Sequence, residues 1–555
     1  MVTLRFKPER LVEISGMDLD VVLDSLFLLK GEVELKDNYV YVELNPDRPD
    51  MFMSEGIARA VRGINSVELG WRAPQVGESG ITVINEMPST RPFIAAAALY
   101  NVNLDEDQLE EVIQFQEKLH DTIGRHRRKV AIGLHDLSKV KSRTLRYSFV
   151  PLSYKMVPLD NNREMSVEEV LRSTEQGKLY GSISRQESLH PAFLDEAGLV
   201  LSLPPVINSE LTRIQPGTRD LLIDVTGTDL PSVLKTLDII VTTLSEGKRS
   251  SIGYVNIINP GSQNLRTPSL NSKYLKLSSD YVNRVLGTSL NQDEVALSLL
   301  KMRYNVKATG EGLLVEVPPF RYDIISEVDL VEDVAMAVGY ESPTLSPNRR
   351  PIESVGSLQR STLLARASRN IMVGLGFTEI LSFILTSSSL LRITGLVDSS
   401  ILIRNPVQQD LDSLRPSLIP QLLDFMRANL DKEKPIKVFE IGKVVYRSGD
   451  TPVEDLRMAA AIMDETVSFE DIQSVAYAYL RSLGLSPSSR ASELPMLIRG
   501  RSATLLSNGT DVGIIGEVNP EVLEKLKITY PVAVFELSLA SLLRALKDGN
   551  TGPQT

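Results

Sequence analysis

Two stretches of turn-forming residues divide this chain of 555 residues before any functional motif is considered. NPGSQNLRTP, residues 259–268, is rich in turn formers and has few apolar residues, which is typical of a linker. ESPTLSPNRRPIES contains three prolines, and proline resists both helix and sheet because it lacks the backbone N–H. The length also exceeds the usual size of one domain. The sequence therefore predicts several domains.

These breaks, and the helix and strand signals between them, define four regions: 1–85, 90–258, 269–345 and 346–547. In the first region, Ser54 is the expected N-cap of a helix that ends at Gly63. The second region contains an expected helix near Asp105–Thr122 and two expected strands, KVAIGLHDL and DLLIDVTG. The predicted fold class is α+β, with the four regions as its domains.

Charge and composition exclude several classes of protein. The net charge of −11 argues against a protein that coats nucleic acid by bulk attraction. Because the chain has no cysteine, it has no disulfide framework, no thiolate nucleophile and no cysteine zinc site. No apolar run approaches the roughly 18 residues of a membrane span, and the first residues lack a secretory signal. We expect a cytoplasmic protein with no membrane partner.

The stretch from Arg125 to Arg146 is locally basic, with eight Lys or Arg and one acid, Asp136. Most charge runs of this kind are simply solvated faces. The alternative is a surface that meets a phosphate backbone. Both interpretations stay open on the residues alone.

A helix is predicted within PPFRYDIISEVDLVEDVAMAVGY, with Ser326 as its N-cap and Gly339 at its end. Its apolar stripe consists of Leu330, Val334, Ala337 and Val338. Four carboxylates lie at or before its first turns: Asp323, Asp329, Glu332 and Asp333. Such a group suits a hard cation such as magnesium, but acids near a helix N-terminus are also favoured by the helix dipole. Spacing alone does not decide between a metal site and a helix end.

This segment resembles the small domain that follows the editing domain in phenylalanyl-tRNA synthetase β subunits. In that family the matching acids contribute to a magnesium site shared with the α subunit, and all four positions are acidic here. Other segments resemble the same subunits in the same order. NPDRPDMFMSEGIARAVRG matches the N-terminal domain, and KLHDTIGRHRRKVAIGLHDL and LPPVINSELTR match the editing domain in its archaeal and eukaryotic version. RNPVQQDLDSLRPSLIPQLLDFMRANL, IKVFEIGKVV and GEVNPEVLEKL match the catalytic-like domain.

The resemblance implies an architecture for each region. Region 1–85 is an N-terminal domain, 90–258 an α/β editing domain, 269–345 a small mixed helical domain, and 346–547 a degenerate class II synthetase domain built on an antiparallel sheet. In the last region Arg415 precedes a helix entry instead of lying on a phosphate-facing strand, and no glycine-rich turn with an arginine follows Glu536. The α subunit is therefore expected to use ATP, within an α2β2 enzyme that charges the tRNA for phenylalanine.

The resemblance also implies an editing site for tyrosine that has been attached in error. An apolar pocket rejects an added hydroxyl only modestly, so a second site that recognises the phenol is useful. Asp224 and Thr226 fall on one face of an expected strand because strand side chains alternate. The remaining candidates are Ser202, Asn208, Ser209 and Glu210. Taken alone, these residues are also explained as helix caps and as hydrogen-bond partners of neighbouring turns.

A hydrolytic mechanism without a covalent intermediate fits the candidates. The chain has four histidines, His120, His126, His135 and His190, and they lie away from the serines in sequence, so a Ser–His–Asp arrangement is not expected. A positioned water, assisted by the terminal hydroxyl of the tRNA, is the expected nucleophile. Two alternatives stay open: a non-catalytic tRNA-binding scaffold that has lost editing, and a free-standing deacylase without a partner.

Overall fold

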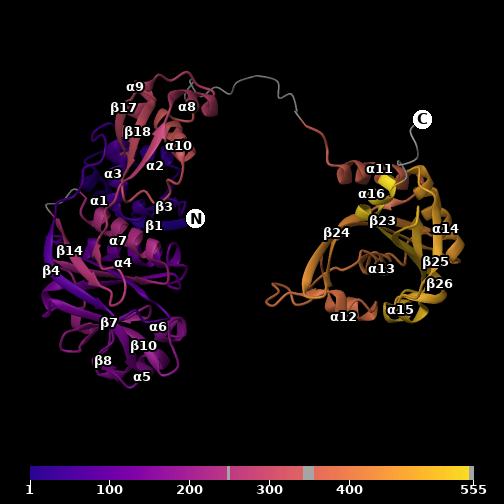
Figure 1. Cartoon of the computed structure of the whole chain (residues 1–555), viewed down its shortest axis with the longest axis horizontal. Helices are drawn as coiled ribbons and strands as arrows, with labels where there is room; N and C mark the ends of the chain where they lie inside the picture. Colours follow the sequence, from indigo (N-terminus) through magenta and orange to yellow (C-terminus); the bar gives the residue numbers. More distant parts are fainter. Residues whose placement is uncertain (247–249, 342–355, 549–555) are drawn as a thin grey trace. The chain divides into compact units, whose positions relative to one another are not determined.

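The structure is a computed structural model that describes residues 1–246, 250–341 and 356–548. It consists of two compact units, Met1–Arg350 and Pro351–Thr555, which are described separately (Figure 1). The predicted boundary between residues 345 and 346 lies outside the described residues. Among the residues that are described, no helix is both long and apolar enough to cross a membrane.

The first unit begins with a three-stranded antiparallel sheet in the order β1-β3-β2, packed against three helices. The elements are β1 (Val2–Phe6), α1 (Pro8–Ser15), α2 (Leu19–Leu28), β2 (Glu32–Lys36), β3 (Tyr39–Leu44) and α3 (Ser54–Ile64). The N-cap of α3 is Met53, so the expectation that Ser54 caps this helix is wrong. The Ser54 hydroxyl instead donates to Glu111. Gly63 lies within the helix, where a Cβ would come 2.3 Å from the Lys301 carbonyl oxygen.

A ten-stranded sheet forms the centre of the unit, in the order β12-β11-β10-β7-β4-β14-β5-β13-β6, with β15 paired to β14. Its strands are β4 (Val76–Asn85), β5 (Phe93–Tyr100), β6 (Val130–Asp136), β7 (Thr144–Pro151), β10 (Leu189–Asp195), β11 (Val200–Leu203), β12 (Ile207–Asn208), β13 (Leu221–Gly227), β14 (Ser251–Ile258) and β15 (Leu265–Thr267). The two strands expected from KVAIGLHDL and DLLIDVTG are confirmed as β6 and β13.

The large sheet extends beyond the region predicted for it. β4 pairs in parallel with β14 and β7, so the sheet starts at Val76 and the expected domain end at residue 85 falls too late. β15 lies within the segment 259–268 that was interpreted as a linker. There the Thr267 hydroxyl donates to the Ala96 carbonyl and accepts from the Ala96 amide. Pairing with distant strands has overridden the turn-forming composition of the segment.

Helices cover one face of β13, and the other face carries Leu222 and the polar side chains of Asp224 and Thr226. α4 (Glu106–Asp121) and α7 (Leu230–Leu244) share one apolar cluster with Ile223 and Val225. α4 agrees with the helix expected near Asp105–Thr122, and the Asp105 carboxylate accepts from the Gln108 amide as its N-cap. Since side chains alternate along a strand, Asp224 and Thr226 project to the face opposite Ile223 and Val225.

The sheet curls until its two edges meet. β12 and β6 stand at opposite ends of the strand order, yet the Asn208 amide nitrogen donates to the Leu134 carbonyl oxygen at 3.1 Å. Side chains of α4 form hydrogen bonds with backbone groups on the outer edge of β6. Gln116 donates to the Ile132 carbonyl at 2.7 Å, and His120 accepts from the Ile132 amide at 2.9 Å. This closure produces a concave space between the edge strands.

Residues 273–338 add a three-stranded sheet and three helices to the first unit. The strands are β16 (Lys273–Leu277), β17 (Asn305–Thr309) and β18 (Gly312–Val317), and the helices are α8 (Ser279–Leu286), α9 (Gln292–Lys301) and α10 (Glu327–Val338). Their apolar residues belong to the same core cluster as those of α3, α4 and α7. The first three regions predicted as separate domains therefore share one hydrophobic core.

The second unit is a seven-stranded sheet in the order β19-β23-β24-β28-β27-β26-β25, antiparallel except for the β19–β23 pair. Its strands are β19 (Thr378–Glu379), β23 (Ile436–Ser448), β24 (Thr451–Met463), β25 (Pro487–Ala491), β26 (Leu497–Ser507), β27 (Thr510–Val518) and β28 (Val532–Ser538). Helices α11 (Arg360–Gly374), α14 (Phe469–Ser482) and α16 (Leu539–Asp548) cover one face, and α13 (Ile419–Arg427) covers the other (Figure 1). The predicted α+β multidomain fold class is confirmed.

Candidate functional site

A cavity of about 880 Å³ lies in the first unit where the large sheet curls on itself. Its walls come from β6, β11, β12 and β13, from α4, and from the short helix α6 (Glu175–Tyr180). Four of the six residues predicted for an editing pocket line it: Ser202, Asn208, Asp224 and Thr226. The curl of the sheet thus brings Ser202 and Asn208, on β11 and β12 at one end of the strand order, together with Asp224 and Thr226, on β13 near the other end.

Asp224 is held by a histidine behind it. It is 1% exposed, and its Oδ1 lies 2.8 Å from His135 Nε2, while His135 Nδ1 lies 2.7 Å from the Thr212 hydroxyl. A carboxylate can only accept, so His135 donates to it from Nε2, and His135 Nδ1 makes the contact with the Thr212 hydroxyl. Oδ2 of Asp224 has no hydrogen-bond partner among the described residues. It is a free acceptor on the cavity wall.

Gly133 makes room for this arrangement. It stands opposite Asp224 in the β6–β13 register, and a Cβ there would come 2.1 Å from Asp224 Oδ1 and 3.0 Å from His135 Nε2. Any larger residue would displace the carboxylate or the imidazole. From the sequence, His135 was noted as a histidine distant from the serines, and its contact with Asp224 was missed. Alternation along β6 puts Gly133 and His135 on one face, but only the register reveals their neighbour.

Thr226 is held by an arginine. Arg91, in the loop before β5, is fully buried, and its Nε donates to the Thr226 hydroxyl at 2.9 Å. Its Nη2 donates to the Thr226 carbonyl at 3.0 Å, and its Nη1 donates to the Arg127 carbonyl at 3.1 Å. Burial lowers the pKa of Arg91 to about 10, so the guanidinium stays charged at neutral pH. No sequence motif pointed to this residue.

Ser202 and Asn208 complete the polar part of the wall. Ser202 is 3% exposed, and its hydroxyl has no hydrogen-bond partner among the described residues. The Asn208 amide is engaged with Leu134 and fixes the sheet edges. Ser202 is therefore available to a ligand, while Asn208 shapes the space.

Ser209 and Glu210 do not line the cavity. The Ser209 hydroxyl donates to the Val157 carbonyl at 3.0 Å and accepts from the Leu211 amide, capping a single helical turn. Glu210 accepts from the Asp160 amide at 3.0 Å and lies 3.4 Å from Arg213. Ser209 therefore agrees with the interpretation as a helix cap, and Glu210 with that of a hydrogen-bond partner of a neighbouring turn.

The other histidines are not part of the polar wall. Burial lowers the pKa of both His120 and His190, to about 4 for His190, so both are neutral at neutral pH. His120 satisfies the edge of β6, and His190 Nδ1 contacts the Pro191 carbonyl. His126 is exposed and lies 3.1 Å from Asp121. A Ser–His–Asp arrangement is therefore not formed by the described histidines.

The basic turn at 125–129 borders the cavity through Arg127. Arg127 has a positive φ of 62°, and its guanidinium turns inward to Glu117 at 2.7 Å and stacks 4.4 Å from the centre of the Tyr180 ring. It also donates to the Val206 carbonyl at 3.0 Å, which ties the turn to the loop between β11 and β12. Arg125 and Arg128 are exposed. This turn is thus partly structural and partly open to solvent.

The predicted acidic helix is confirmed as α10, with Ser326 as N-cap and Gly339 at its end. Its acids do not share one outward face. Asp333 is 2% exposed, because its place beside the apolar stripe turns it inward, where it accepts from the Tyr304 hydroxyl and from Arg321 at 2.6 Å. Arg321 also binds both oxygens of Asp323, at 2.9 and 2.6 Å. One buried arginine therefore neutralises two of the four acids.

The other two acids of the set have different partners. Asp329 Oδ2 accepts from the backbone amides of Ile325 and Ser326 in a capping box, and the exposed Glu332 lies 3.2 Å from Lys30. Within the described residues, no group of three or more His, Cys, Asp or Glu side chains is arranged to hold a metal ion. The four acids therefore do not fit a magnesium ion held by this chain alone.

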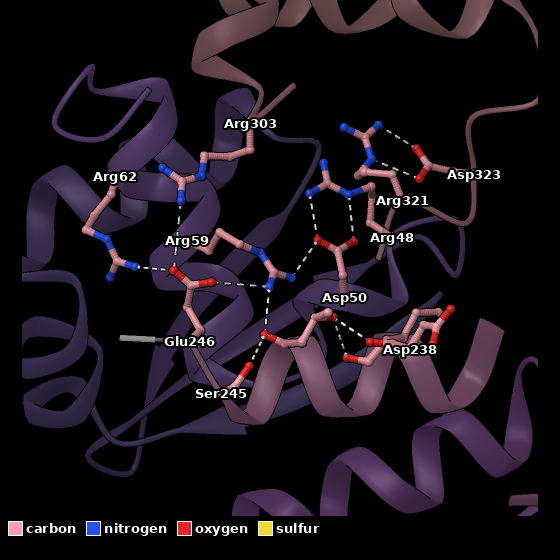
Figure 2. A network of polar contacts seen from close by, with 12 residues as sticks. Arg48, Asp50, Arg59, Arg62, Asp238, Ser245, Glu246, Arg303, Arg321 and Asp323 are labelled. Carbon is pink, nitrogen blue, oxygen red and sulfur yellow. Dashed lines mark hydrogen bonds and ion pairs between the residues drawn. The ribbon is translucent and has the colours of Figure 1, made fainter. Parts of the chain in front are cut away.

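Figure 2 shows that Arg321 and Asp323 border a larger network of buried charges. Arg48 and Arg59 both contact Asp50, at 2.9 and 3.4 Å, and Arg62 contacts Glu246 at 2.7 Å. Arg59 also stacks 3.6 Å from the centre of the Phe320 ring. These contacts join residues from three of the regions predicted as domains. The network is a structural junction between these regions.

The second unit offers no free arginine at the position considered for ATP. Arg415 is 3% exposed, and its Nη1 lies 2.7 Å from Glu440 and 2.9 Å from Gln421. α13 packs Leu418, Ile419 and Leu422 onto this face of the sheet. The guanidinium is engaged in an ion pair with Glu440, and the chain enters α13 shortly afterwards, at Ile419.

Known proteins and family models match nearly the whole length of this chain. The tRNA synthetase B5 domain model matches residues 275–340, and the phenylalanyl-tRNA synthetase beta chain CLM domain model matches residues 347–539. A phenylalanine–tRNA ligase beta subunit of Aeropyrum pernix is 45% identical over 546 residues, covering 98% of this chain and 99% of the relative. That of Sulfurisphaera tokodaii is 44% identical over 521 residues, covering 93% and 94%. An N-terminal fragment of the phenylalanyl-tRNA synthetase beta subunit from Pyrococcus horikoshii, 32% identical, superimposes with a TM-score of 0.58, covering 61% of this chain and 100% of the fragment.

Proposed function

The chain belongs to the family of phenylalanine–tRNA ligase β subunits, and from that premise we propose that it completes a ligase and removes tyrosine attached in error. The family membership implies an α subunit and a tRNA as partners. The finer proposal is an α2β2 cytoplasmic enzyme for phenylalanine, in which this chain contributes assembly and editing. The contacts of the first unit support the editing role, and those of the second unit support the assembly role.

In this proposal the α subunit forms the aminoacyl-adenylate with ATP. The ion pair of Arg415 and the covering of the sheet by α13 support a domain that pairs with a partner without binding nucleotide. Magnesium accompanies ATP on the α subunit. Asp329 and Glu332 are the two acids of α10 outside the Arg321 ion pairs, so they are the side chains we expect to face an ion held between subunits.

The observation that carries the editing proposal is the cavity wall that holds Asp224 as an acceptor and Thr226 beside it. Tyrosine differs from phenylalanine by a phenolic O–H, and Asp224 Oδ2 is suited to accept it. A site built to hydrogen-bond a hydroxyl rejects the analogue that lacks one, because its buried polar group is then left unpaired. The cavity volume of about 880 Å³ leaves room for an aminoacylated nucleoside.

The proposed reaction is hydrolysis of the ester between tyrosine and the terminal ribose. Water attacks the ester carbonyl carbon, and the carbonyl oxygen takes up the negative charge. Collapse of this intermediate breaks the bond to the ribose oxygen, which receives the proton that the water has lost. Free tyrosine and uncharged tRNA leave. Arg125 and Arg128, exposed beside the inward-facing Arg127, are the expected contacts for the terminal phosphates of the tRNA.

The test is the rate at which the co-purified α and β chains release tyrosine from tyrosyl-tRNA for phenylalanine, with phenylalanyl-tRNA in parallel. The proposal expects rapid release of tyrosine and slow release of phenylalanine. Equal and slow release of both amino acids would overturn the editing role. The chain would then be a tRNA-binding and assembly scaffold whose cavity is inactive.

A further inference from the structure

Arg91 differs from every other arginine that the structure describes as buried. Those other arginines each lie within ion-pair distance of a carboxylate: Arg10–Glu55, Arg48–Asp50, Arg59–Asp50, Arg303–Glu68, Arg321–Asp323 and Arg415–Glu440. The acceptors of the Arg91 guanidinium are the Thr226 hydroxyl and two backbone carbonyls, all neutral. Burying a charge without an ion pair is costly. Its placement behind the cavity therefore calls for an explanation beyond packing.

The hydrogen bond from Arg91 determines which donor and acceptor positions of the Thr226 hydroxyl remain free. A hydroxyl has one donor and two acceptor positions, and Arg91 Nε occupies an acceptor position of Thr226 Oγ1. No described residue accepts the Thr226 proton, and Thr226, although fully buried, forms part of the cavity wall. The O–H is thus free to donate into the cavity. A charged donor on its oxygen also strengthens this hydroxyl as a donor, because linked hydrogen bonds polarise one another.

We propose that Arg91 makes the Thr226 hydroxyl the donor that stabilises the negative charge on the ester carbonyl oxygen during hydrolysis, an inference that rests on the editing function proposed above. Thr226 touches the reacting oxygen, and Arg91 is a positioning residue that acts through it. A guanidinium without a carboxylate partner keeps its positive field for the charge that develops in the cavity. An ion pair at this position would cancel that field.

In this proposal the two polar residues of β13, Asp224 and Thr226, have different roles. Asp224, with His135 behind it, presents an acceptor to the phenol. Thr226, with charged Arg91 behind it, presents a donor to the carbonyl oxygen. Loss of the Thr226 hydroxyl therefore slows the chemical step, whereas loss of the Asp224 acceptor weakens recognition of tyrosine. Arg91 must act on the same step as Thr226 and on no other.

The test measures kcat and KM for tyrosyl-tRNA hydrolysis by the complete α/β enzyme. Thr226→Val should lower kcat about 10²-fold with KM unchanged, as for loss of one oxyanion donor, and Thr226→Ser should restore most of it. Arg91→Lys should lower kcat about tenfold because it keeps the charge but loses the Nε geometry. The double variant Arg91→Lys/Thr226→Val should be no slower than Thr226→Val alone, since Arg91 acts through the hydroxyl.

Tyr147→Phe is the matched control. It removes a buried hydroxyl that donates to the Arg91 carbonyl at 2.9 Å, but it leaves the contact between Arg91 and Thr226 intact. Its kcat should stay within about twofold of wild type, because it removes no group that we assign to the transition state. An equal loss in Tyr147→Phe and Arg91→Lys would show that any change at this position perturbs the site, and would overturn the proposal.

Two further outcomes are decisive. Losses that multiply in the double variant, or a change in KM alone, would overturn the role of Arg91 while leaving editing itself intact. A wild-type enzyme that does not release tyrosine would overturn both proposals together. The fluorescence of Trp71, the single tryptophan of the chain, reports whether the first unit is folded. If Arg91→Lys does not fold, Arg91→Gln replaces it, with the same expected loss and the same lack of additivity.

Discussion

Asp224 and Asp333 are buried to almost the same degree, 1% and 2% exposed, yet their surroundings differ in charge. Asp333 lies 2.6 Å from the Arg321 guanidinium and accepts a further bond from Tyr304. Asp224 accepts from His135 and keeps one oxygen on the wall of a cavity. Burial is therefore a poor guide to what a carboxylate does. The charge and direction of its partners separate a structural acid from one that is open to a ligand.

The largest expected effect is on stability, at the arginine that holds two acids. Arg321→Met would leave Asp323 and Asp333 without their shared cation, and breaking a buried ion pair in this way typically costs about 3–5 kcal/mol. Urea unfolding followed by Trp71 fluorescence measures the loss in the first unit. Lys276→Ala, which removes an exposed pair with Glu311 in the same unit, should leave the midpoint unchanged. A small loss for Arg321→Met would break the contrast with Asp224.

Glu111 is a third buried acid, and it should make the stability of the first unit depend on pH. Burial raises the pKa of Glu111 to about 7, although Arg10 lies 3.2 Å away. The folded chain therefore holds a proton that the unfolded chain releases near pH 4.5, so stability should fall as pH rises from about 4.5 to about 7. Glu111→Gln should remove this slope, a change on the order of 3 kcal/mol between the two ends.

The measurement is the urea midpoint of the Trp71 signal at pH 5 and pH 8. Glu110→Gln is the control, since Glu110 is an exposed neighbour on the same helix and pairs with Arg5. The wild-type slope should persist in that variant. An unchanged slope in Glu111→Gln would mean that Glu111 is not the titrating group.

Gly133 tests whether the position of Asp224 depends on the space beside it. In Gly133→Ala the new methyl would collide with Asp224 Oδ1, so we expect tyrosine release to fall about tenfold or more, with a stability loss of about 1–3 kcal/mol. Gly77→Ala is the matched control in β4 of the same sheet, because a Cβ there meets no atom within 4 Å. Normal editing in Gly133→Ala would contradict the assigned geometry.

The smallest expected effect on folding is at Asp329. Asp329→Ala removes the capping box of α10 and should cost about 1 kcal/mol in the first unit. Association with the α subunit at limiting magnesium should weaken more than this, if Asp329 faces an ion held between subunits. Pull-down of the α subunit across a magnesium series measures it. Complex formation that matches wild type would remove α10 from the proposed metal site.

Local patterns predicted the elements that carry these residues. The N-cap Ser326 and the terminal Gly339 define α10, and alternating apolar residues define β6 and β13, because both signals depend on neighbours in sequence. The acids of α10 were harder to assign. Asp333 borders the apolar stripe closely enough to be buried, and only the position of Arg321 in three dimensions reveals why an acid is tolerated there.

The cavity itself depended on pairings that no local pattern contains. The curl of the sheet, closed by Asn208 and Leu134, arises from strand pairings between distant segments. Arg91 and His135 reach Thr226 and Asp224 from other strands and loops, so neither could be linked to the site by spacing. The resemblance to a family identified Asp224 and Thr226 on β13. The structure identified His135 and Arg91, which contact them.

The most direct test of the contrast between Asp224 and Asp333 replaces one carboxylate oxygen of each residue by an amide nitrogen. In Asp224→Asn the side-chain oxygen should keep the bond from His135 and turn the amide nitrogen to the cavity, so the phenol loses its acceptor. Tyrosine release should fall about 10- to 100-fold while the Trp71 unfolding midpoint stays unchanged. Asp333→Asn should shift the midpoint strongly and leave release by the folded enzyme unchanged. The opposite pattern, with Asp333 controlling release and Asp224 controlling stability, would contradict the account.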